Sequence, residues 1–365
     1  MPPTWFAIRQ ESPARRAALL PLDALSLVYG AGARLHRELY ARGWRRPARL
    51  SCRVVSVGNL VVGGSGKTPL AAWIAAELRR RGHRVVLASR GFGRRGREAV
   101  EVVSDGRHVL STAERAGDEP LLLAAHAPGV PVLVGRDRAV VGLRAVSAFG
   151  CQVLVLDDGF QHHRLARDLD LVACDGGSGL GNGRLLPRGP LREPLSALAR
   201  AHGIAVVDGP LPPEDEAAIA SAAPSARRFR ARRVPAVLRP LAGGPGASPD
   251  TLQGRKVGLL SGIARPDSLR RSVESVGAVV VAERSFPDHH CYRPRDLHGL
   301  GRGAPLWVTT EKDAVKILPA WAGDADVRVL AIELDVDDPR TLLEWIEEKL
   351  RGTPRGRDAT LPAFG

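Results

Sequence analysis

The chain has 365 residues, of which 44% are apolar and 25% are charged, as in a typical soluble globular protein. At roughly 150 residues per domain, this length predicts two domains. The formal net charge of +14 is compatible with a nucleic-acid partner or an anionic membrane surface. Lysine occurs at only five positions, however, so a bias toward arginine accounts for part of the charge and weakens the argument from it.

Cysteine spacing and hydropathy exclude further classes of protein. The four cysteines are far apart and form no C-x-x-C pair, so we expect neither a disulfide framework nor a zinc site, and we infer a reducing cytoplasm. No stretch approaches the ~20 uninterrupted apolar residues that a membrane-spanning helix needs. The beginning of the chain also lacks the basic-then-apolar layout of a cleaved signal peptide.

The first predicted element is an amphipathic helix within residues 17–40. Leu25, Val28 and Leu35 recur at roughly helical spacing, and arginines and tryptophans flank the segment on both sides. An apolar face with basic flanks and tryptophan is typical of a helix that lies on a membrane surface. A helix packed on the domain core has the same spacing, and the residues alone do not decide between the two.

A phosphate-binding loop follows within residues 54–81. A β-branched run predicts a buried strand, the sequence GGSGKT follows it, and apolar residues at helical spacing come next. In this order, glycines let N–H groups face an anion and the helix N-terminus adds positive potential. We expect Lys67 to reach terminal phosphates and Thr68 to bind Mg²⁺. The predicted nucleotide-binding residues are Gly63, Gly64, Ser65, Gly66, Lys67 and Thr68.

The loop departs from the strict pattern G-x-x-x-x-G-K-[ST] at one position, where Val61 replaces glycine. An ordinary glycine-rich turn between strand and helix is therefore the alternative. The Lys-Thr pair and the flanking elements favour the nucleotide-binding loop.

Further strands and helices alternate along the chain. Apolar strand runs are predicted at 84–89, 130–134, 152–156 and 169–173, and an edge strand at 98–103. One helix is predicted to open at residues 117–120 and run through 121–125, and another at 137–148. This alternation predicts an α/β fold, a P-loop NTPase-like parallel sheet with helices on both faces. Ligands in such sheets bind at the carboxyl ends of strands, where the GGSGKT loop, Asp157, Asp158 and Asp175 would lie.

The second half of the chain differs in composition and in its predicted elements. Residues 176–195 are rich in glycine and proline and predict a long irregular loop. From about residue 223 a β-ribbon pattern leads into strands at 256–261, 278–285, 306–309 and 327–333 and helices at 266–276 and 339–350. We therefore divide the chain into a P-loop domain at 1–222 and a smaller C-terminal α/β lobe with its β-ribbon linker at 223–365, and we expect a loose tail after Arg351.

Carboxylates mark a metal site. The strand VLVLDD ends in Asp157 and Asp158, which can hold Mg²⁺ directly or through water, and Gln161 adds a polar group nearby. Asp118 and Glu119 open a predicted helix, where simple capping is the alternative. The predicted metal ligands are Thr68, Asp157, Asp158, Glu119 and Gln161.

Two stretches of the second lobe carry candidate chemistry. His289 lies in SFPDHH after a strand, and a histidine held by a carboxylate is the usual base for a hydroxyl proton. The hydroxyls and lysines of TTEKDAVK at 309–316 either close over a nucleotide or cap a helix. We expect His162 and His163 to orient neighbours, because no clustered ligands support a transition-metal site.

Together these motifs resemble those of the lipid A 4′-kinases (tetraacyldisaccharide 4′-kinases). The similar stretches span residues 57–316 in the family's order: VGNLVVGGSGKTP, ASRGFGRR, GDEPLLLA, LDDGFQHHRLARDLDLV, GNGRLLPRGPLREP, FPDHHCY and TEKDAVK. Val61 fits the family's own pattern GN-x-x-x-GG-x-GKTP. Phe92 stands where the family has tyrosine, so we do not expect a hydroxyl contact at that position.

The resemblance implies transfer of the γ-phosphate of ATP, with Mg²⁺, to the 4′-hydroxyl of a tetraacylated glucosamine disaccharide 1-phosphate, which yields lipid IVA. It also implies a peripheral enzyme on the cytoplasmic face of the bacterial inner membrane. The expected partners are therefore the lipid-linked disaccharide and an anionic membrane surface, with no nucleic acid, and we expect a monomer. Asp118 and His289 match the family's catalytic pair and lie in different lobes, so the lobes would have to close for activity.

Two other functions are compatible with parts of the sequence. A P-loop GTPase or metallochaperone that acts on a protein partner is compatible with the loop and the histidine pairs, but the chain contains no guanine-reading N-K-x-D. A nucleic-acid-dependent ATPase rests on net charge alone.

Overall fold

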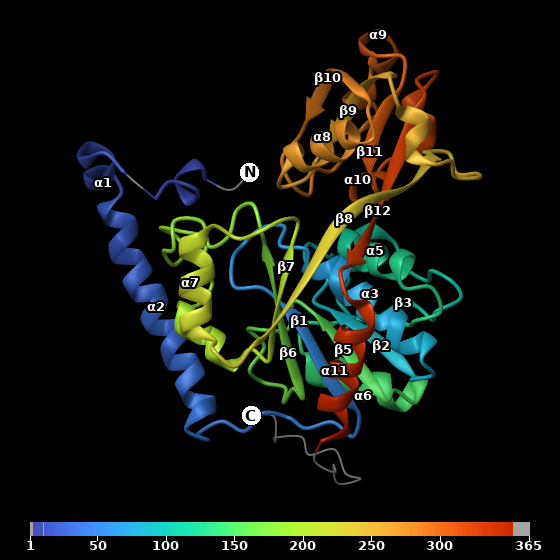
Figure 1. Cartoon of the computed structure of the whole chain (residues 1–365). Coiled ribbons are helices and arrows are strands. Elements are labelled where there is room, and N and C mark those ends of the chain that lie inside the picture. Colours follow the sequence, from blue (N-terminus) through green and yellow to red (C-terminus); the bar gives the residue numbers. More distant parts are fainter. Residues whose placement is uncertain (1–2, 10, 353–365) are drawn as a thin grey trace.

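The computed structural model describes residues 3–9 and 11–352 (Figure 1). The predicted loose tail lies, apart from Gly352, outside the described residues. The strands are β1 (Arg53–Gly58), β2 (Val85–Ser89), β3 (Glu101–Ser104), β4 (Val132–Val134), β5 (Val153–Asp157), β6 (Leu169–Asp175), β7 (Gly203–Val207), β8 (Arg227–Pro240), β9 (Lys256–Ser261), β10 (Val279–Ser285), β11 (Trp307–Thr310) and β12 (Val327–Val336). The helices are α1 (Pro13–Ala18), α2 (Leu20–Ala41), α3 (Lys67–Arg80), α4 (Ala113–Ala116), α5 (Asp118–His126), α6 (Arg138–Phe149), α7 (Pro213–Ala222), α8 (Pro266–Ser275), α9 (Leu300–Gly303), α10 (Glu311–Ala314) and α11 (Pro339–Arg351).

All twelve strands join in one sheet, in the order β10-β9-β11-β12-β8-β7-β6-β1-β5-β2-β4-β3. Neighbouring strands are parallel except at β8–β12 and β3–β4. The predicted parallel sheet is therefore confirmed, and β3 is the predicted edge strand. Strand β7 and helices α1, α4, α7 and α9 were not predicted, whereas α5 confirms the helix that residues 117–120 were expected to open.

Side-chain alternation along the central strands explains the layers. Val55 and Val57 of β1 point into one apolar core with Leu70 and Ile74 of α3. Val54 points to the opposite face, into a second core to which α6 contributes. Because both faces of the strands are apolar, both need a covering helix, and the sheet is sandwiched as predicted.

Strands β8 and β12 form the long antiparallel ribbon that connects the two parts of the molecule (Figure 1). The first half of β8 pairs in parallel with β7, and the rest pairs with β12, so the ribbon belongs to the continuous sheet. After β12 the chain returns to the first part, where Trp345 and Ile346 of α11 join the core beside α3. The division into 1–222 and 223–365 stays a prediction, and α11 packs with the P-loop part.

Helix α2 lies at the side of the molecule (Figure 1). One face of α2 packs against the loop that precedes the 3-10 segment η2 (Leu195–Arg200). The packing is close, because a Cβ added to Gly30 would lie 2.7 Å from the side chain of Leu185. The other face carries exposed apolar side chains, among them Leu27, which is 76% exposed, and Val28, which is 71% exposed. In the described ranges, no helix is both long and apolar enough to cross a bilayer.

Candidate active site

The glycine-rich loop joins β1 to α3 at the centre of the sheet. Gly66 caps α3 with a φ of +82°, and a Cβ there would meet Val207 at 2.9 Å, so this position requires glycine. The Oγ of Ser65 is buried and has no hydrogen-bond partner among the described residues. A loop with free donors at a helix N-terminus is the geometry that binds phosphate.

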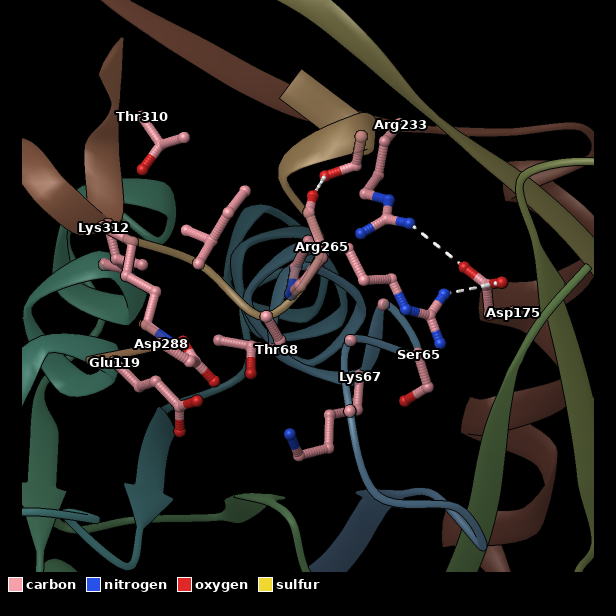
Figure 2. A pocket seen from close by; sticks show the side chains of 18 of the residues that line it. Ser65, Lys67, Thr68, Glu119, Asp175, Arg233, Arg265, Asp288, Thr310 and Lys312 are labelled. Carbon is pink, nitrogen blue, oxygen red and sulfur yellow. Dashed lines mark hydrogen bonds and ion pairs between the residues drawn. The ribbon is translucent and has the colours of Figure 1, made fainter. Parts of the chain in front are cut away.

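Lys67 points into the same cavity as the carboxylates of the site (Figure 2). Burial disfavours its charged form, but the negative charges of Glu119, Asp158 and Asp157 outweigh burial and raise the pKa of Lys67. Lys67 therefore stays a cation where a nucleotide would place its terminal phosphates.

The two adjacent aspartates have different surroundings. Asp157 is fully buried at the end of β5, and the Oγ1 of Thr68 lies 3.3 Å from its carboxylate. Burial raises the pKa of Asp157, against the attraction of Lys67. Asp158 accepts hydrogen bonds of 2.9 and 3.0 Å from Arg192, and burial of its carboxylate is outweighed by Lys67 and Arg192, which lower its pKa.

The donor set fits a hard divalent cation. The hydroxyl of Thr68 and the carboxylate of Asp157 are adjacent. The amide Nε2 of Gln161 donates to the carbonyl of Asn59, whereas its Oε1 is buried and has no hydrogen-bond partner in the described part of the chain. Glu119 lines the same cavity (Figure 2). The described residues contain no group of three or more His, Cys, Asp or Glu side chains arranged as metal ligands. Mg²⁺ needs no such cage, since it takes one or two carboxylates together with phosphates and water.

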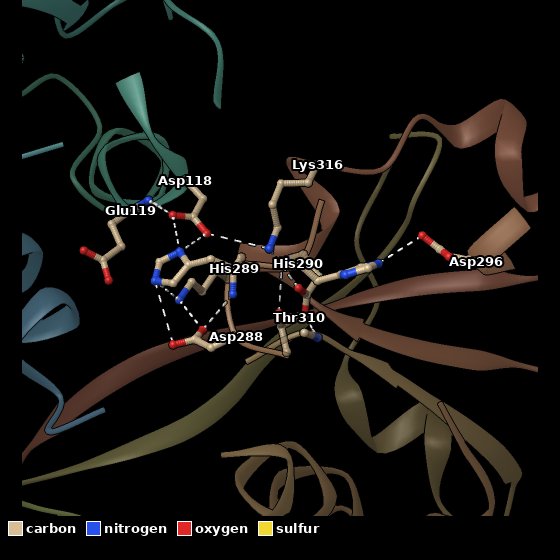
Figure 3. Close-up of polar contacts among 11 residues, drawn as sticks. Asp118, Glu119, Asp288, His289, His290, Asp296, Thr310 and Lys316 are labelled. Atoms are coloured by element: carbon tan, nitrogen blue, oxygen red, sulfur yellow. Dashed lines mark hydrogen bonds and ion pairs between the residues drawn. The ribbon is translucent and has the colours of Figure 1, made fainter. Parts of the chain in front are cut away.

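Asp118 and His289 meet across the two lobes (Figure 3). Asp118 begins α5 and is 5% exposed, and its carboxylate oxygens lie 3.0 and 3.2 Å from the Nδ1 of His289. The hydrogen bond to Asp118 raises the pKa of His289, although burial opposes the rise. Burial of Asp118 is outweighed by His289 and nearby lysines, so the pKa of Asp118 is lowered. The pair thus resembles a histidine base held by a carboxylate.

His289 also has an unusual backbone. Its φ is +59°, a left-handed conformation that is uncommon outside glycine and often found at functional sites. The ring of Phe92 lies 5.2 Å from the imidazole ring, centroid to centroid. Phenylalanine supplies an apolar wall here and no hydroxyl, as expected from the sequence.

Three further histidines have different surroundings. His162 lines the cavity, but burial lowers its pKa to about 4. Burial also lowers the pKa of His163 to about 3, and its ring stacks on Tyr40 of α2. His290 bonds to Asp296 at 3.0 Å.

A cavity of about 1910 Å³ connects these parts. Figure 2 shows Glu119, Asp288 and Lys312 on one side of it, and Asp175 with Arg233 and Arg265 on the other. Arg265 of the second lobe forms an ion pair of 2.8 Å with Asp175, and Arg233 one of 3.3 Å. Sequence reasoning missed Arg192, Arg233 and Arg265, because the chain's many arginines give no signal of which ones face a site. It did single out Lys312, which lies 3.2 Å from the Nε2 of His289.

Comparisons with known proteins agree with this geometry. The family described as LpxK, tetraacyldisaccharide-1-P 4′-kinase, matches residues 17–351. A tetraacyldisaccharide 4′-kinase of Anaeromyxobacter sp. (strain Fw109-5) is 44% identical over 341 residues, 91% of each chain. One from Syntrophus aciditrophicus is 37% identical over 91% of this chain and 93% of that protein.

A solved structure is also similar. The crystal structure of LpxK from Aquifex aeolicus, described as an "apo" form in complex with ATP, has a TM-score of 0.72 at 30% identity and covers 92% of this chain and 99% of that one. The predicted P-loop kinase fold is therefore confirmed. With its central loop, its cavity and a match over nearly its whole length, the chain belongs to the tetraacyldisaccharide-1-phosphate 4′-kinase family.

Proposed function

We propose that this protein is an ATP-dependent kinase that phosphorylates the 4′-hydroxyl of tetraacyldisaccharide 1-phosphate and yields lipid IVA. Its relatives carry the name of that activity. The observation that carries the proposal is that the P-loop and His289 line one cavity, and that Asp118, from the same part of the chain as the P-loop, holds the imidazole of His289. A kinase needs this arrangement, because catalysis consists largely of placing the acceptor hydroxyl in line with the bond to be broken and neutralising charge.

The P-loop holds the donor. Backbone N–H groups at the N-terminus of α3 would face the phosphates, the Oγ of Ser65 is free to donate to one of them, and the ammonium of Lys67 would neutralise charge on the β- and γ-phosphates. Arg265 and Arg233 extend the positive wall of the cavity next to the loop.

Thr68, Asp157 and Glu119 would hold Mg²⁺, with Asp158 and Gln161 beside them. The ion supplies charge neutralisation between the β- and γ-phosphates when it is bound. Asp157 is the better candidate for direct contact, because Arg192 already occupies the carboxylate of Asp158.

Asp118 and His289 act on the acceptor. The carboxylate of Asp118 accepts the Nδ1–H of His289, which leaves the Nε2 lone pair to take the proton of the 4′-hydroxyl. The acceptor oxygen then forms its bond to the γ-phosphorus as the bond to the β-phosphate oxygen breaks, and ADP leaves. Asp118 stabilises the imidazolium that results, as it already does in raising the pKa of His289.

The alternative, a P-loop GTPase or metallochaperone, is not favoured by the family match. The discriminating experiment measures ³²P transfer from labelled ATP, and separately from labelled GTP, to the purified disaccharide 1-phosphate in detergent micelles. Labelled lipid from ATP is the expected result. Nucleotide hydrolysis with no labelled lipid, or a preference for GTP, would contradict the proposal.

Membrane association is part of the proposal. The acceptor is a lipid, and α2 presents exposed apolar side chains beside arginines, as peripheral membrane helices do. We therefore assign the enzyme to the cytoplasmic face of the inner membrane as a monomer without a nucleic-acid partner. Mass measurement of the detergent-solubilised protein tests the oligomeric state.

A further inference from the structure

Lys312 occupies the side of His289 that faces the cavity. Its Nζ lies 2.9 Å from a carboxylate oxygen of Asp288 and 3.2 Å from the Nε2 of His289. The side chain is 18% exposed and lines the same cavity as Lys67 and Thr68. Lys312 is the second residue of α10 and lies two residues after the end of β11, so a short helical turn at the end of a strand positions it.

This contact concerns the atom that has to accept a proton. A neutral imidazole has one N–H and one lone pair, and the contact to Asp118 places the N–H of His289 on Nδ1. The lone pair on Nε2 then faces the ammonium of Lys312, which has donors and no acceptor. A water or an acceptor hydroxyl can reach the base only if Lys312 moves away from it.

We propose that Lys312 is a further catalytic residue: it covers the base until the acceptor arrives, and it then supplies its positive charge to the phosphoryl group that is being transferred. The inference rests on the proposed function and deepens it. The acceptor hydroxyl must lie within hydrogen-bond reach of Nε2 and also in line with the γ-phosphate. An ammonium displaced from Nε2 by that hydroxyl is therefore adjacent to the reacting phosphate.

The acceptor O–H replaces the Lys312 N–H at the Nε2 of His289, and Lys312 keeps all its protons. The new O–P bond forms, the bond between γ-phosphorus and the β-phosphate oxygen breaks, and ADP leaves with that electron pair. The hydroxyl proton ends on Nε2, and solvent later receives it from the imidazolium.

The neighbouring lysine cannot take this role in the same way. Lys316 lies 3.2 Å from Asp313 and 3.7 Å from Asp118, on the side of the pair away from Nε2, and it is not among the residues that line the cavity. The groups that face His289 are therefore Asp118 from α5, Asp288 from its own loop, Lys312 from α10, Lys316 through Asp118, and the ring of Phe92.

The charge of Lys312 has a measurable effect on the base. The Asp118 hydrogen bond raises the pKa of His289, whereas burial and the positive charge of Lys312 oppose the rise. Replacing Lys312 by an uncharged residue therefore raises that pKa. Because the reaction uses neutral His289, the acidic limb of kcat/KM moves to higher pH.

The experiment compares Lys312→Met, Lys312→Arg and the control Lys256→Met in the full-length enzyme, with ATP and the disaccharide 1-phosphate in micelles. Lys256 is exposed at the start of β9 in the same lobe and serves as the matched loss of one lysine. For Lys312→Met we expect kcat to fall on the order of 10²-fold, the size typical of one lost charge-stabilising donor. We also expect the acidic limb to move to higher pH, and the ratio of acceptor-independent ATP hydrolysis to transfer to rise.

Lys312→Arg keeps a cation, so its acidic limb should stay near that of the wild type and part of kcat should return. Thermal melting of each variant, with and without ATP, checks folding. A folded Lys312→Met with wild-type kcat would overturn the inference, as would equal losses in Met and Arg variants with an unmoved acidic limb. No lipid product from the wild-type enzyme would instead overturn the proposed function, and this inference with it.

Discussion

The Nδ1 of His289 lies 3.0 Å from a carboxylate oxygen of Asp118, although 171 residues separate the two in the chain. The contact exists because β8 and β12 carry the second lobe over the carboxyl ends of the central strands. The two side chains thus meet only in the folded chain, and this explains why each stretch taken alone has an ordinary structural interpretation.

Replacing Asp118 by alanine tests this pair. The variant loses the group that orients His289 and stabilises its charged form, so we expect kcat to fall on the order of 10²–10⁴-fold. ATP affinity should change little, because Asp118 contacts His289 and Lys316 and is not among the residues that line the cavity with the P-loop. Steady-state transfer kinetics and ATP titration of the same preparation check both parts. Near-normal turnover would remove Asp118 from the mechanism.

The pH profile of Asp118→Asn is a second test. In the proposed mechanism transfer needs neutral His289, so kcat/KM should increase as pH rises through the pKa of that residue. The hydrogen bond and negative charge of Asp118 raise this pKa, and removing the charge lowers it. The acidic limb should therefore move to lower pH, opposite to the direction for Lys312→Met. A limb that stays in place would show that a group other than His289 titrates in it.

The glycine loop gives a prediction about stability. Gly66→Ala places a Cβ against Val207 at a φ of +82°, and we expect it to cost roughly 1–3 kcal/mol of unfolding free energy. Gly64→Ala is the matched control: its φ is not in the left-handed region, and a Cβ there has no neighbour within 4 Å. Chemical denaturation of both variants measures the difference. Equal unfolding free energies would contradict the close packing seen at Gly66.

Local patterns in the sequence predicted much of the fold and of the site. The strand, glycine loop and helix around Lys67 are encoded within one short stretch, so periodicity and turn residues suffice to find them. The alternating Val54 and Val55 likewise predict a strand buried on both faces. Strand β7 has the same apolar character at 203–207, but the glycines and prolines on either side obscure its pattern in the sequence.

Local patterns could not predict which charged side chains pair with each other. Arg265 pairs with Asp175, and Lys312 reaches His289, only because separate loops converge after the sheet has formed. A sequence shows which side chains carry charge, whereas the identity of the opposite charge depends on the tertiary fold. The return of α11 to the first core is the same kind of long-range fact: its apolar face was evident, but the surface that it covers was not.

The two adjacent aspartates should differ in their effect on Mg²⁺. Asp157 lies beside the hydroxyl of Thr68, so Asp157→Asn should raise the half-saturating Mg²⁺ concentration roughly 10–100-fold. Asp158→Asn leaves Arg192 without its partner and should act less on Mg²⁺ than on protein stability. Mg²⁺ titrations of kinase activity, with melting curves of both variants, separate the effects. A larger Mg²⁺ effect in Asp158→Asn would reverse the assignment.

Membrane contact through α2 is tested by making its exposed face acidic. Leu27→Glu with Val28→Glu removes two apolar side chains that are 76% and 71% exposed, so the fold should be kept. Burying one such side chain is worth ~1.5–3 kcal/mol, and an acidic residue is also repelled by anionic lipid. Binding to vesicles that contain anionic lipid should therefore weaken at least about tenfold, as measured by flotation.

The matched control is Val279→Glu, on the edge strand β10 of the second lobe, where the side chain is 49% exposed. It introduces the same acidic side chain at an apolar position far from α2, and vesicle binding should stay at the wild-type level. An equal loss in both variants would mean that net charge, and not the apolar face of α2, governs binding. An unchanged double variant would show that α2 is a packed helix and not a membrane contact.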